Sequence, residues 1–148
     1  MEKKRIKSRF IPGLLCFLVF SATFVPMGTV TELEGQAREV GVAALGVTFW
    51  LSLILGIVLS ARAAALCRRA GGGGTRGSPW RFFSNAWGCV ADAVLIIALG
   101  CAAAIVLHPP EAQWLYLGEL GLLSLGVSMH CLFNSNTFRF IYKGSGDK

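Results

Sequence analysis

Three properties of the sequence predict an all-α membrane protein with four transmembrane helices. The 148-residue chain is 54% hydrophobic and only 15% charged, whereas a soluble domain carries about 25% charged residues. Its mean hydropathy is +0.60. Its apolar residues form continuous runs of the length that an α-helix needs to cross the ~30 Å hydrocarbon core of a bilayer. Such runs differ from the short alternating segments that are typical of a β-barrel.

Four apolar runs define the predicted spans within a single transmembrane domain, residues 1–148. They cover residues 10–27, 40–61, 87–107 and 114–133. The first run follows a basic start, as a secretory signal peptide does, but no small-x-small cleavage site follows it. We therefore expect it to be retained as a helix. The second and third runs are separated by the longest polar segment, residues 62–86.

The distribution of basic residues predicts the orientation. Thirteen of the 14 Lys and Arg residues lie at the two ends of the chain or between the second and third runs, and only Arg38 lies in the other two loops. Cytoplasmic loops retain Lys and Arg during insertion. Both termini and the 62–86 loop are therefore expected in the cytoplasm. This topology, together with attraction to anionic lipid head groups, explains the net charge of +6 without a nucleic-acid partner.

Two patterns concern the second span. Thr31 and Glu34 match a capping box, which predicts that this helix begins outside the bilayer near Thr31. Ser52, Gly56 and Ser60 recur at every fourth position, so they form a row of small residues that another helix can approach closely. The row predicts a helix-packing face, and the sequence leaves open whether that face lies within one chain or between two chains.

The segment before the third span predicts a short helix at the membrane interface. Ser78 and Pro79 suit the N-cap and the first position of such a helix. Aromatic side chains follow at helical spacing, and Trp and Tyr are enriched at membrane interfaces. A helix that docks a partner protein is the alternative. The predicted interface anchors are Trp80, Phe83 and Trp87 on the cytoplasmic side and Trp114 and Tyr116 on the outer side.

Three ionisable residues, Asp92, Glu119 and His130, fall inside apolar runs. Asp92 lies roughly 10 Å inside the inner end of the third span. Eleven residues separate Glu119 from His130, which is close to three helical turns, so both lie on one face of the fourth span with Gly126 between them. His130 lies near the inner end at a depth comparable with that of Asp92. Antiparallel packing of the two spans therefore allows an Asp92–His130 pair.

The buried acids Asp92 and Glu119 have a structural and a functional explanation. Ionisable residues in hydrocarbon are costly, face the bundle interior and often mark function. As structural groups they would hydrogen-bond to neighbouring helices. As functional groups they would form a relay for protons or cations. A third explanation is that they lie shallow enough to reach water.

The cysteines and histidines predict neither a disulfide framework nor a metal or cofactor site. None of the five Cys residues lies in an outer loop, where disulfides form. Cys89, Asp92, His130 and Cys131 do not match the ligand spacing of zinc sites. The chain also lacks a phosphate-binding Gly-rich motif and a recognisable nucleophile–base arrangement. We therefore do not expect an enzyme.

Two segments, PWRFFSNAWGCVADAVL and MHCLFNSNTFRFIY, resemble small, mostly uncharacterised multi-span membrane proteins of Gram-positive, Clostridia-like bacteria. The matching residues are Phe82, Phe83, Asn85, Asp92, His130, Cys131 and Asn134. Ser135 stands where those proteins usually have Gly. The resemblance covers a minor part of the chain and carries no activity. It implies a bacterial membrane protein in which Asp92 and His130 belong to one arrangement.

These observations predict a small multi-pass protein of the bacterial cytoplasmic (cell) membrane. We expect it to be a structural, regulatory or accessory subunit that acts by association, with the lipid bilayer, another membrane protein or a second copy of the chain as partners. The alternative is a small transporter or channel that uses Asp92 and Glu119. Four helices rarely enclose a substrate cavity, so that alternative requires an oligomer.

Overall fold

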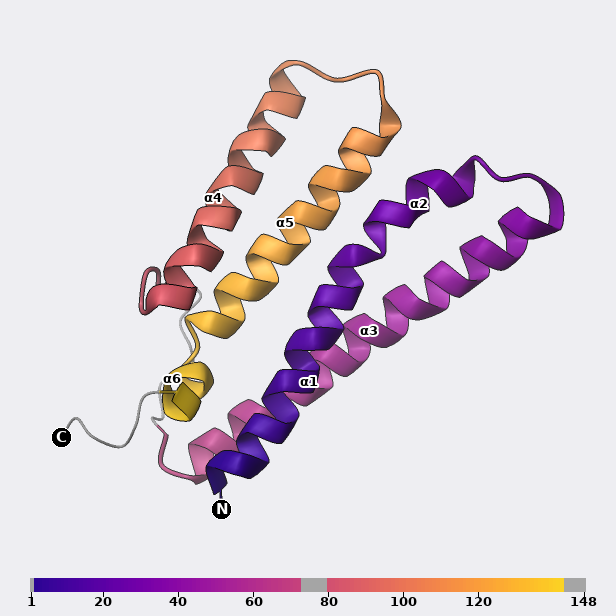
Figure 1. Ribbon diagram of the computed structural model, residues 1–148. Helices are drawn as coiled ribbons and strands as arrows, with labels where there is room; N and C mark the ends of the chain where they lie inside the picture. Colours follow the sequence, from indigo (N-terminus) through magenta and orange to yellow (C-terminus); the bar gives the residue numbers. More distant parts are fainter. Residues whose placement is uncertain (1, 73–79, 143–148) are drawn as a thin grey trace.

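The computed structural model, which describes residues 2–72 and 80–142, consists of helices arranged in two hairpins (Figure 1). The helices are α1 (Glu2–Ala22), α2 (Phe24–Thr31), α3 (Gly35–Arg69), α4 (Ala86–Leu107), α5 (Gln113–Phe133) and α6 (Asn136–Tyr142). No strand occurs in the described ranges. The α1–α2 pair, α3, α4 and α5 are each long and apolar enough to cross a membrane. The prediction of an all-helical chain with four candidate membrane spans is therefore confirmed.

Helices α1 and α2 form one candidate span of 30 residues with an interruption at Thr23. Pro26 has no backbone N–H, so it cannot donate to the carbonyl of Ala22, where α1 ends. The Thr23 hydroxyl donates a 2.6 Å hydrogen bond to the carbonyl of Phe20, which satisfies part of the broken helical ladder. The first predicted span, residues 10–27, lies within this longer candidate span.

The turn between α2 and α3 differs from the predicted capping box. Thr31 is the last residue of α2, and its hydroxyl donates a 2.7 Å hydrogen bond back to the carbonyl of Gly28. α3 begins at Gly35, and Glu34 precedes it in an extended conformation without a side-chain cap. The predicted capping box is therefore wrong, because the Thr31 hydroxyl is used within the preceding helix; the helix of the second span starts four residues after Thr31, at Gly35.

The row of small residues on α3 packs inside the chain. A Cβ atom added to Gly56 would lie 3.2 Å from the ring of Phe17 on α1. Conversely, a Cβ atom added to Gly13 on α1 would lie 2.8 Å from the hydroxyl oxygen of Ser60. Ser52 is buried on the same helix. The sequence leaves open whether this packing face lies within one chain or between two chains. In the structure it packs within the chain, at the close approach of α1 and α3.

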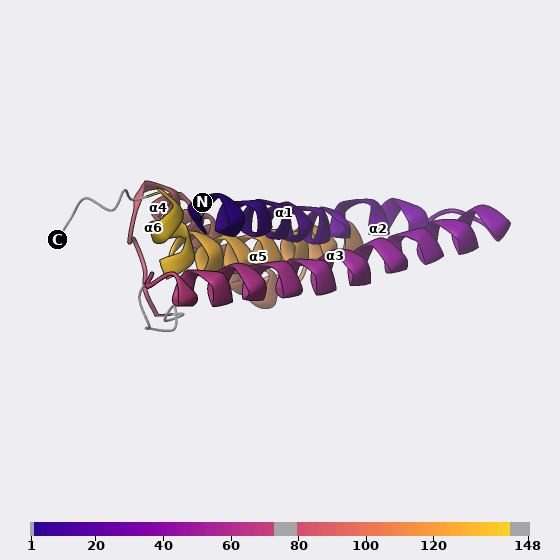
Figure 2. The same cartoon turned by 90° about the horizontal axis from the view of Figure 1, so that it is seen from below.

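The helices lie side by side in the order α4, α5, α1–α2 and α3, and they do not close into a bundle (Figure 1). In the described ranges, the backbone of helix α4 lies next to that of α5 alone, whereas the backbone of α3 lies next to those of α1, α2 and α6 but not next to that of α4 or α5. Helix α6 packs against α1, α3 and α5, close to the N-terminus of α1. From this α6 end, α3 extends along the molecule together with α1 and α2 (Figure 2). The tips of the two hairpins diverge at the opposite end (Figure 1).

The predicted interfacial helix before the third span is not confirmed. Residues 80–85 are irregular, and α4 begins at Ala86. The expected helix start at Ser78 and Pro79 lies outside the described residues. Phe83 has a φ of 52°, in the left-handed region that interrupts a right-handed helix. Asn85 then caps α4, since its side-chain oxygen accepts a 2.8 Å hydrogen bond from the Gly88 N–H.

Candidate functional site

Asp92 is at the centre of a buried polar network at the α6 end of the α4–α5 hairpin. Its side chain is fully buried. Oδ1 lies 2.5 Å from His130 Nδ1 and accepts a 3.0 Å hydrogen bond from Asn134 Nδ2. Oδ2 accepts a 2.6 Å hydrogen bond from the backbone N–H of Phe83. We call these four residues and Ser84 the Asp92 network. Both carboxyl oxygens are therefore engaged by groups of the same chain.

Two glycines bring α4 and α5 close enough for this network to form. A Cβ atom added to Gly88 on α4 would collide with the side-chain oxygen of Asn134. A Cβ atom added to Gly126 on α5 would lie 2.9 Å from the Cα of Leu95 on α4. Substituting either glycine would therefore push the helices apart and lengthen the hydrogen bonds of the network.

Asn134 joins Asp92 to the irregular segment that precedes α4. It follows the last residue of α5, and it is buried. Its Oδ1 accepts hydrogen bonds from the Ser84 N–H at 3.1 Å and from the Ser84 hydroxyl at 2.7 Å. Nearby, Asn85 Nδ2 donates a 2.7 Å hydrogen bond to the carbonyl of Phe133. The end of α5 and the entry to α4 are thus tied together by two asparagines.

The imidazole of His130 is held by a hydrogen bond and by an aromatic contact. A carboxylate oxygen can only accept, so a hydrogen bond with ionised Asp92 places the ring proton on Nδ1. Asn134 Nδ2 also lies 3.3 Å from Nδ1, but both atoms then carry hydrogen, and we assign the amide hydrogen bond to Asp92. The ring of Phe82 lies against the imidazole with 4.5 Å between centroids. His130 is therefore held in position from two sides.

Glu119 does not belong to the Asp92 network. Asp92 and Glu119 each lie within two turns of the first residue of their helix, and α4 and α5 run antiparallel, so the two acids lie towards opposite ends of the hairpin. The Glu119 side chain is half-buried, and its Oε1 is buried without a hydrogen-bond partner among the residues described. The structure therefore does not bring together the two acids of the predicted relay.

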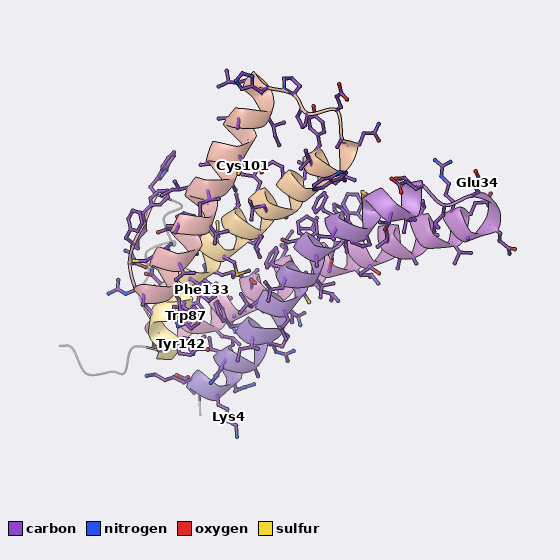
Figure 3. All side chains as sticks on the ribbon, turned by 45° about the horizontal axis from the view of Figure 1, so that its top comes forward. Lys4, Glu34, Trp87, Cys101, Phe133 and Tyr142 are labelled. Carbon is purple, nitrogen blue, oxygen red and sulfur yellow. The ribbon has the colours of Figure 1, made fainter. Side chains whose placement is uncertain are left out.

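The five predicted interface anchors all have exposed side chains near helix ends: Trp80, Phe83, Trp87, Trp114 and Tyr116. The hydroxyl of Tyr116 donates a 3.2 Å hydrogen bond to the carbonyl of Pro110 in the turn between α4 and α5. Trp87 and Phe133 lie close to Tyr142, the last residue of α6, whereas Cys101 lies farther along α4 (Figure 3). The aromatic residues near α6 form a chain of ring contacts, including Trp87 with Phe133 at 5.9 Å.

The cysteine, histidine and acidic side chains do not gather into a metal site in the part of the chain that the structure describes. Cys89 and Cys131 are exposed, whereas Asp92 and His130 point into the buried network. The four residues considered as metal ligands are thus divided between two environments.

A groove of about 450 Å³ separates α3 from α5. Ile57 and Ser60 of α3 lie on one side, Val127 of α5 lies on the other, and Phe17 of α1 is also part of the lining. The lining becomes polar towards α6, where it includes Thr137. The buried hydroxyl of Ser60 has no hydrogen-bond partner within the described ranges. The groove arises because α3 packs on α1 and leaves the adjacent side of α5 uncovered.

The contact between Asp92 and His130 agrees with the comparable depths that the sequence assigned to them. The contributions of Phe83 and Ser84 were not predicted, because a backbone N–H donor and an irregular segment have no sequence periodicity. A usable signal was the occurrence of asparagine directly before α4, at Asn85, and directly after α5, at Asn134, because asparagine side chains pair readily with free backbone groups at helix ends.

Fold and site together define a multi-pass membrane protein with four candidate spans and a polar network at one end of its second hairpin. Comparison with known proteins adds no closer assignment: no family, no curated protein sequence and no solved structure matches the chain. Its function must therefore be inferred from its own residues.

Proposed function

We propose that this protein is a structural or accessory subunit of the bacterial cytoplasmic membrane, which acts by association with another membrane protein. The observation that carries the proposal is the complete engagement of Asp92 by Phe83, His130 and Asn134. Hydrogen bonds of this kind hold membrane helices together. This engagement supports a structural role for Asp92, and a structural role favours association over transport or catalysis.

We propose that both termini lie in the cytoplasm. The basic start of α1, the basic end of α3 and α6 all lie at one end of the molecule (Figure 1), which is the arrangement that the positive-inside rule requires. Thr31 and Gln113 are exposed near the opposite end. In intact cells, single cysteines at these positions, in a chain without its native cysteines, should react with a membrane-impermeant reagent. Failure of both to react would overturn the orientation.

The site of association that we propose is the groove between α3 and α5, and its occupant is a transmembrane helix of the partner. The groove is lined mainly by apolar side chains of three spans, and Ile57 on its edge is 53% exposed. Packing and interhelical hydrogen bonds drive helix association in lipid, where hydrophobic burial does not. Ser128, which is half-buried and also lines the groove, carries a hydroxyl that can take part in such a hydrogen bond with a polar group of the incoming helix.

Photo-crosslinking at two matched isoleucines tests this proposal. A photoreactive amino acid replaces Ile57 beside the groove or Ile97 on α4, which is similarly exposed at 59% but lies outside the groove. We expect position 57 to yield a discrete product with a second protein and position 97 to yield none. Identical products from both positions would contradict the proposed site. If position 57 instead crosslinks to a second copy of the chain, the occupant of the groove is that second copy, and the protein is a homo-oligomer.

Transport remains the second candidate because of one observation: Oε1 of Glu119 is buried and has no hydrogen-bond partner among the residues that the structure describes. An intramembrane acid without a partner is a candidate functional group. If Glu119 and Asp92 both lie on one pathway for protons or cations, the Asp92→Asn and Glu119→Gln proteins should accumulate normally but lose ion flux in liposomes. If wild-type protein gives no flux above that of empty liposomes, this candidate fails.

A further inference from the structure

Four arginines from two helices line a single pocket at the α6 end of the molecule. Arg5 and Arg9 belong to α1, and Arg62 and Arg69 belong to α3. The pocket has a volume of about 350 Å³, and the hydroxyl-bearing Ser8 is also part of its lining. We call this the arginine pocket. It is distinct from the groove between α3 and α5 and from the Asp92 network, because it shares no lining residue with either.

The packing of α1 against α3 explains why the arginines meet. Arg5 and Arg9 are one turn apart on α1, and Arg62 and Arg69 are two turns apart on α3, so each pair lies on one face of its helix. The two helices run antiparallel and approach closely beside the pocket, where Gly13 meets Ser60. The start of α1 therefore lies next to the end of α3, and both arginine pairs face the same pocket.

In the described part of the chain, no acidic side chain pairs with the arginines of this pocket. The lining residues include no Asp or Glu, and within residues 2–72 and 80–142 the only ion pair is that of Asp92 with His130. Apart from Asp92, Glu2 is the one described acid on this side of the apolar spans. Like charges one turn apart on a helix destabilise it. Binding of an anion would offset this repulsion, so the folded chain favours anion binding at this pocket.

The neighbouring lysines provide an informative contrast on the same helix. Lys3 Nζ lies 5.6 Å from the centroid of the Phe140 ring, and Lys7 Nζ lies 5.6 Å from that of Tyr142. Both are cation–π contacts with α6. One cationic face of α1 is thus occupied by aromatic rings, whereas the face with Arg5 and Arg9 is open.

We propose that the arginine pocket binds a phosphate group at the membrane boundary. The planar guanidinium group donates two parallel hydrogen bonds to phosphate oxygens, which a lysine ammonium cannot do. Arg9 directly precedes the apolar part of α1, and Arg62 directly follows that of α3. The pocket therefore lies at the level of lipid head groups. This position favours the phosphate of an anionic phospholipid as its source, and free inorganic phosphate is the other source with the same chemistry.

Native mass spectrometry of the full chain in uncharged detergent tests the proposal. The protein is titrated with short-chain phosphatidic acid, and with phosphatidylcholine for comparison. Arg5→Gln/Arg9→Gln removes two charges from the pocket, and Lys3→Gln/Lys7→Gln removes two charges from the opposite face of α1. We expect the arginine variant to bind phosphatidic acid about 25-fold more weakly, at about fivefold per basic residue, and the lysine control to stay within about threefold of wild type.

Two further arms identify the anion and its mode of binding. Arg5→Lys/Arg9→Lys keeps the charge but removes the forked donors, so we expect it to bind more weakly than wild type. Inorganic phosphate that displaces the lipid at concentrations similar to those of the lipid would assign the site to a free anion, and displacement only at large excess would assign it to the lipid. Equal weakening in the arginine and lysine variants, or wild-type binding of phosphatidic acid no stronger than that of phosphatidylcholine, would overturn the proposal. Circular dichroism confirms that each variant is folded.

Discussion

The Nδ1 atom of His130 lies 2.5 Å from Oδ1 of Asp92, which joins residues 38 positions apart on two antiparallel helices. Both side chains are buried. Asn134 and the backbone of Phe83 complete the contacts of the carboxyl group. Breaking one partner of a buried hydrogen bond costs more than the bond itself contributes, because the remaining group stays desolvated. The Asp92 network should therefore hold the α4–α5 hairpin and the segment before it as one unit.

Substitution of Asp92 should destabilise the protein in a graded way. Asp92→Leu leaves the Phe83 N–H, His130 and Asn134 without their acceptor, and we expect it to lower the free energy of unfolding by about 3 kcal/mol or more, at about 1–3 kcal/mol for each unsatisfied group. Asp92→Asn keeps one acceptor oxygen and should cost less. Thermal unfolding in mild detergent measures both. A fully stable Asp92→Leu protein would show that the network does not hold the hairpin.

Gly88 should not tolerate a methyl group. In Gly88→Ala the new Cβ would collide with the side-chain oxygen of Asn134, and we expect a loss of about 1–3 kcal/mol in the free energy of unfolding. Gly100→Ala is the control on the same helix, because nothing lies within 4 Å of its added Cβ. It should be neutral or stabilising by up to about 1 kcal/mol, since alanine favours the helix. Equal effects of the two substitutions would contradict the close approach at Gly88.

Gly126 should be equally restricted, for a different reason. The Cβ of Gly126→Ala would lie 2.9 Å from the backbone of Leu95, which cannot rotate away as a side chain can. We expect α4 and α5 to separate and the unfolding temperature to fall. Gly118→Ala, also on α5 but with nothing within 4 Å of the added Cβ, should leave the unfolding temperature unchanged. A lower unfolding temperature for Gly118→Ala alone would contradict the described packing.

Glu119→Gln should be tolerated, in contrast to the substitutions of Asp92. The glutamine has nearly the same shape, and the buried Oε1 atom of Glu119 makes no hydrogen bond in the described part of the chain that the substitution would break. We expect the protein level in membranes and the unfolding temperature to match those of wild type. Severe loss of folded protein would mean that the Glu119 carboxyl has a structural partner in the membrane.

The sequence predicts the spans well because they depend on length and hydropathy, which are local properties. It also predicts that Asp92 and His130 lie at similar depths, because depth follows from position along a helix. The break at Thr23 had a sequence signal in Pro26, whose missing N–H interrupts the helix. The row of Ser52, Gly56 and Ser60 predicts a packing face, but only the structure shows that α1 packs there.

The remaining features depend on contacts that sequence spacing does not encode. The left-handed conformation of Phe83 is unusual for a bulky residue, and it occurs at the residue whose N–H donates a hydrogen bond to Asp92. The arginine pocket requires that α1 and α3 be neighbours. The basic residues at the start of α1 and at the end of α3 were predicted to mark the cytoplasmic side. Their grouping around one pocket depends on how these two helices pack.

Affinity purification of the full chain from native membranes in mild detergent, read by mass spectrometry and by mass in solution, tests the proposed association most directly. We predict a second membrane protein in stoichiometric amount, and we predict that it is retained in the Asp92→Asn variant as long as that variant is folded. Recovery of the chain alone, as a monomer or as a homo-oligomer, would contradict a role as an accessory subunit.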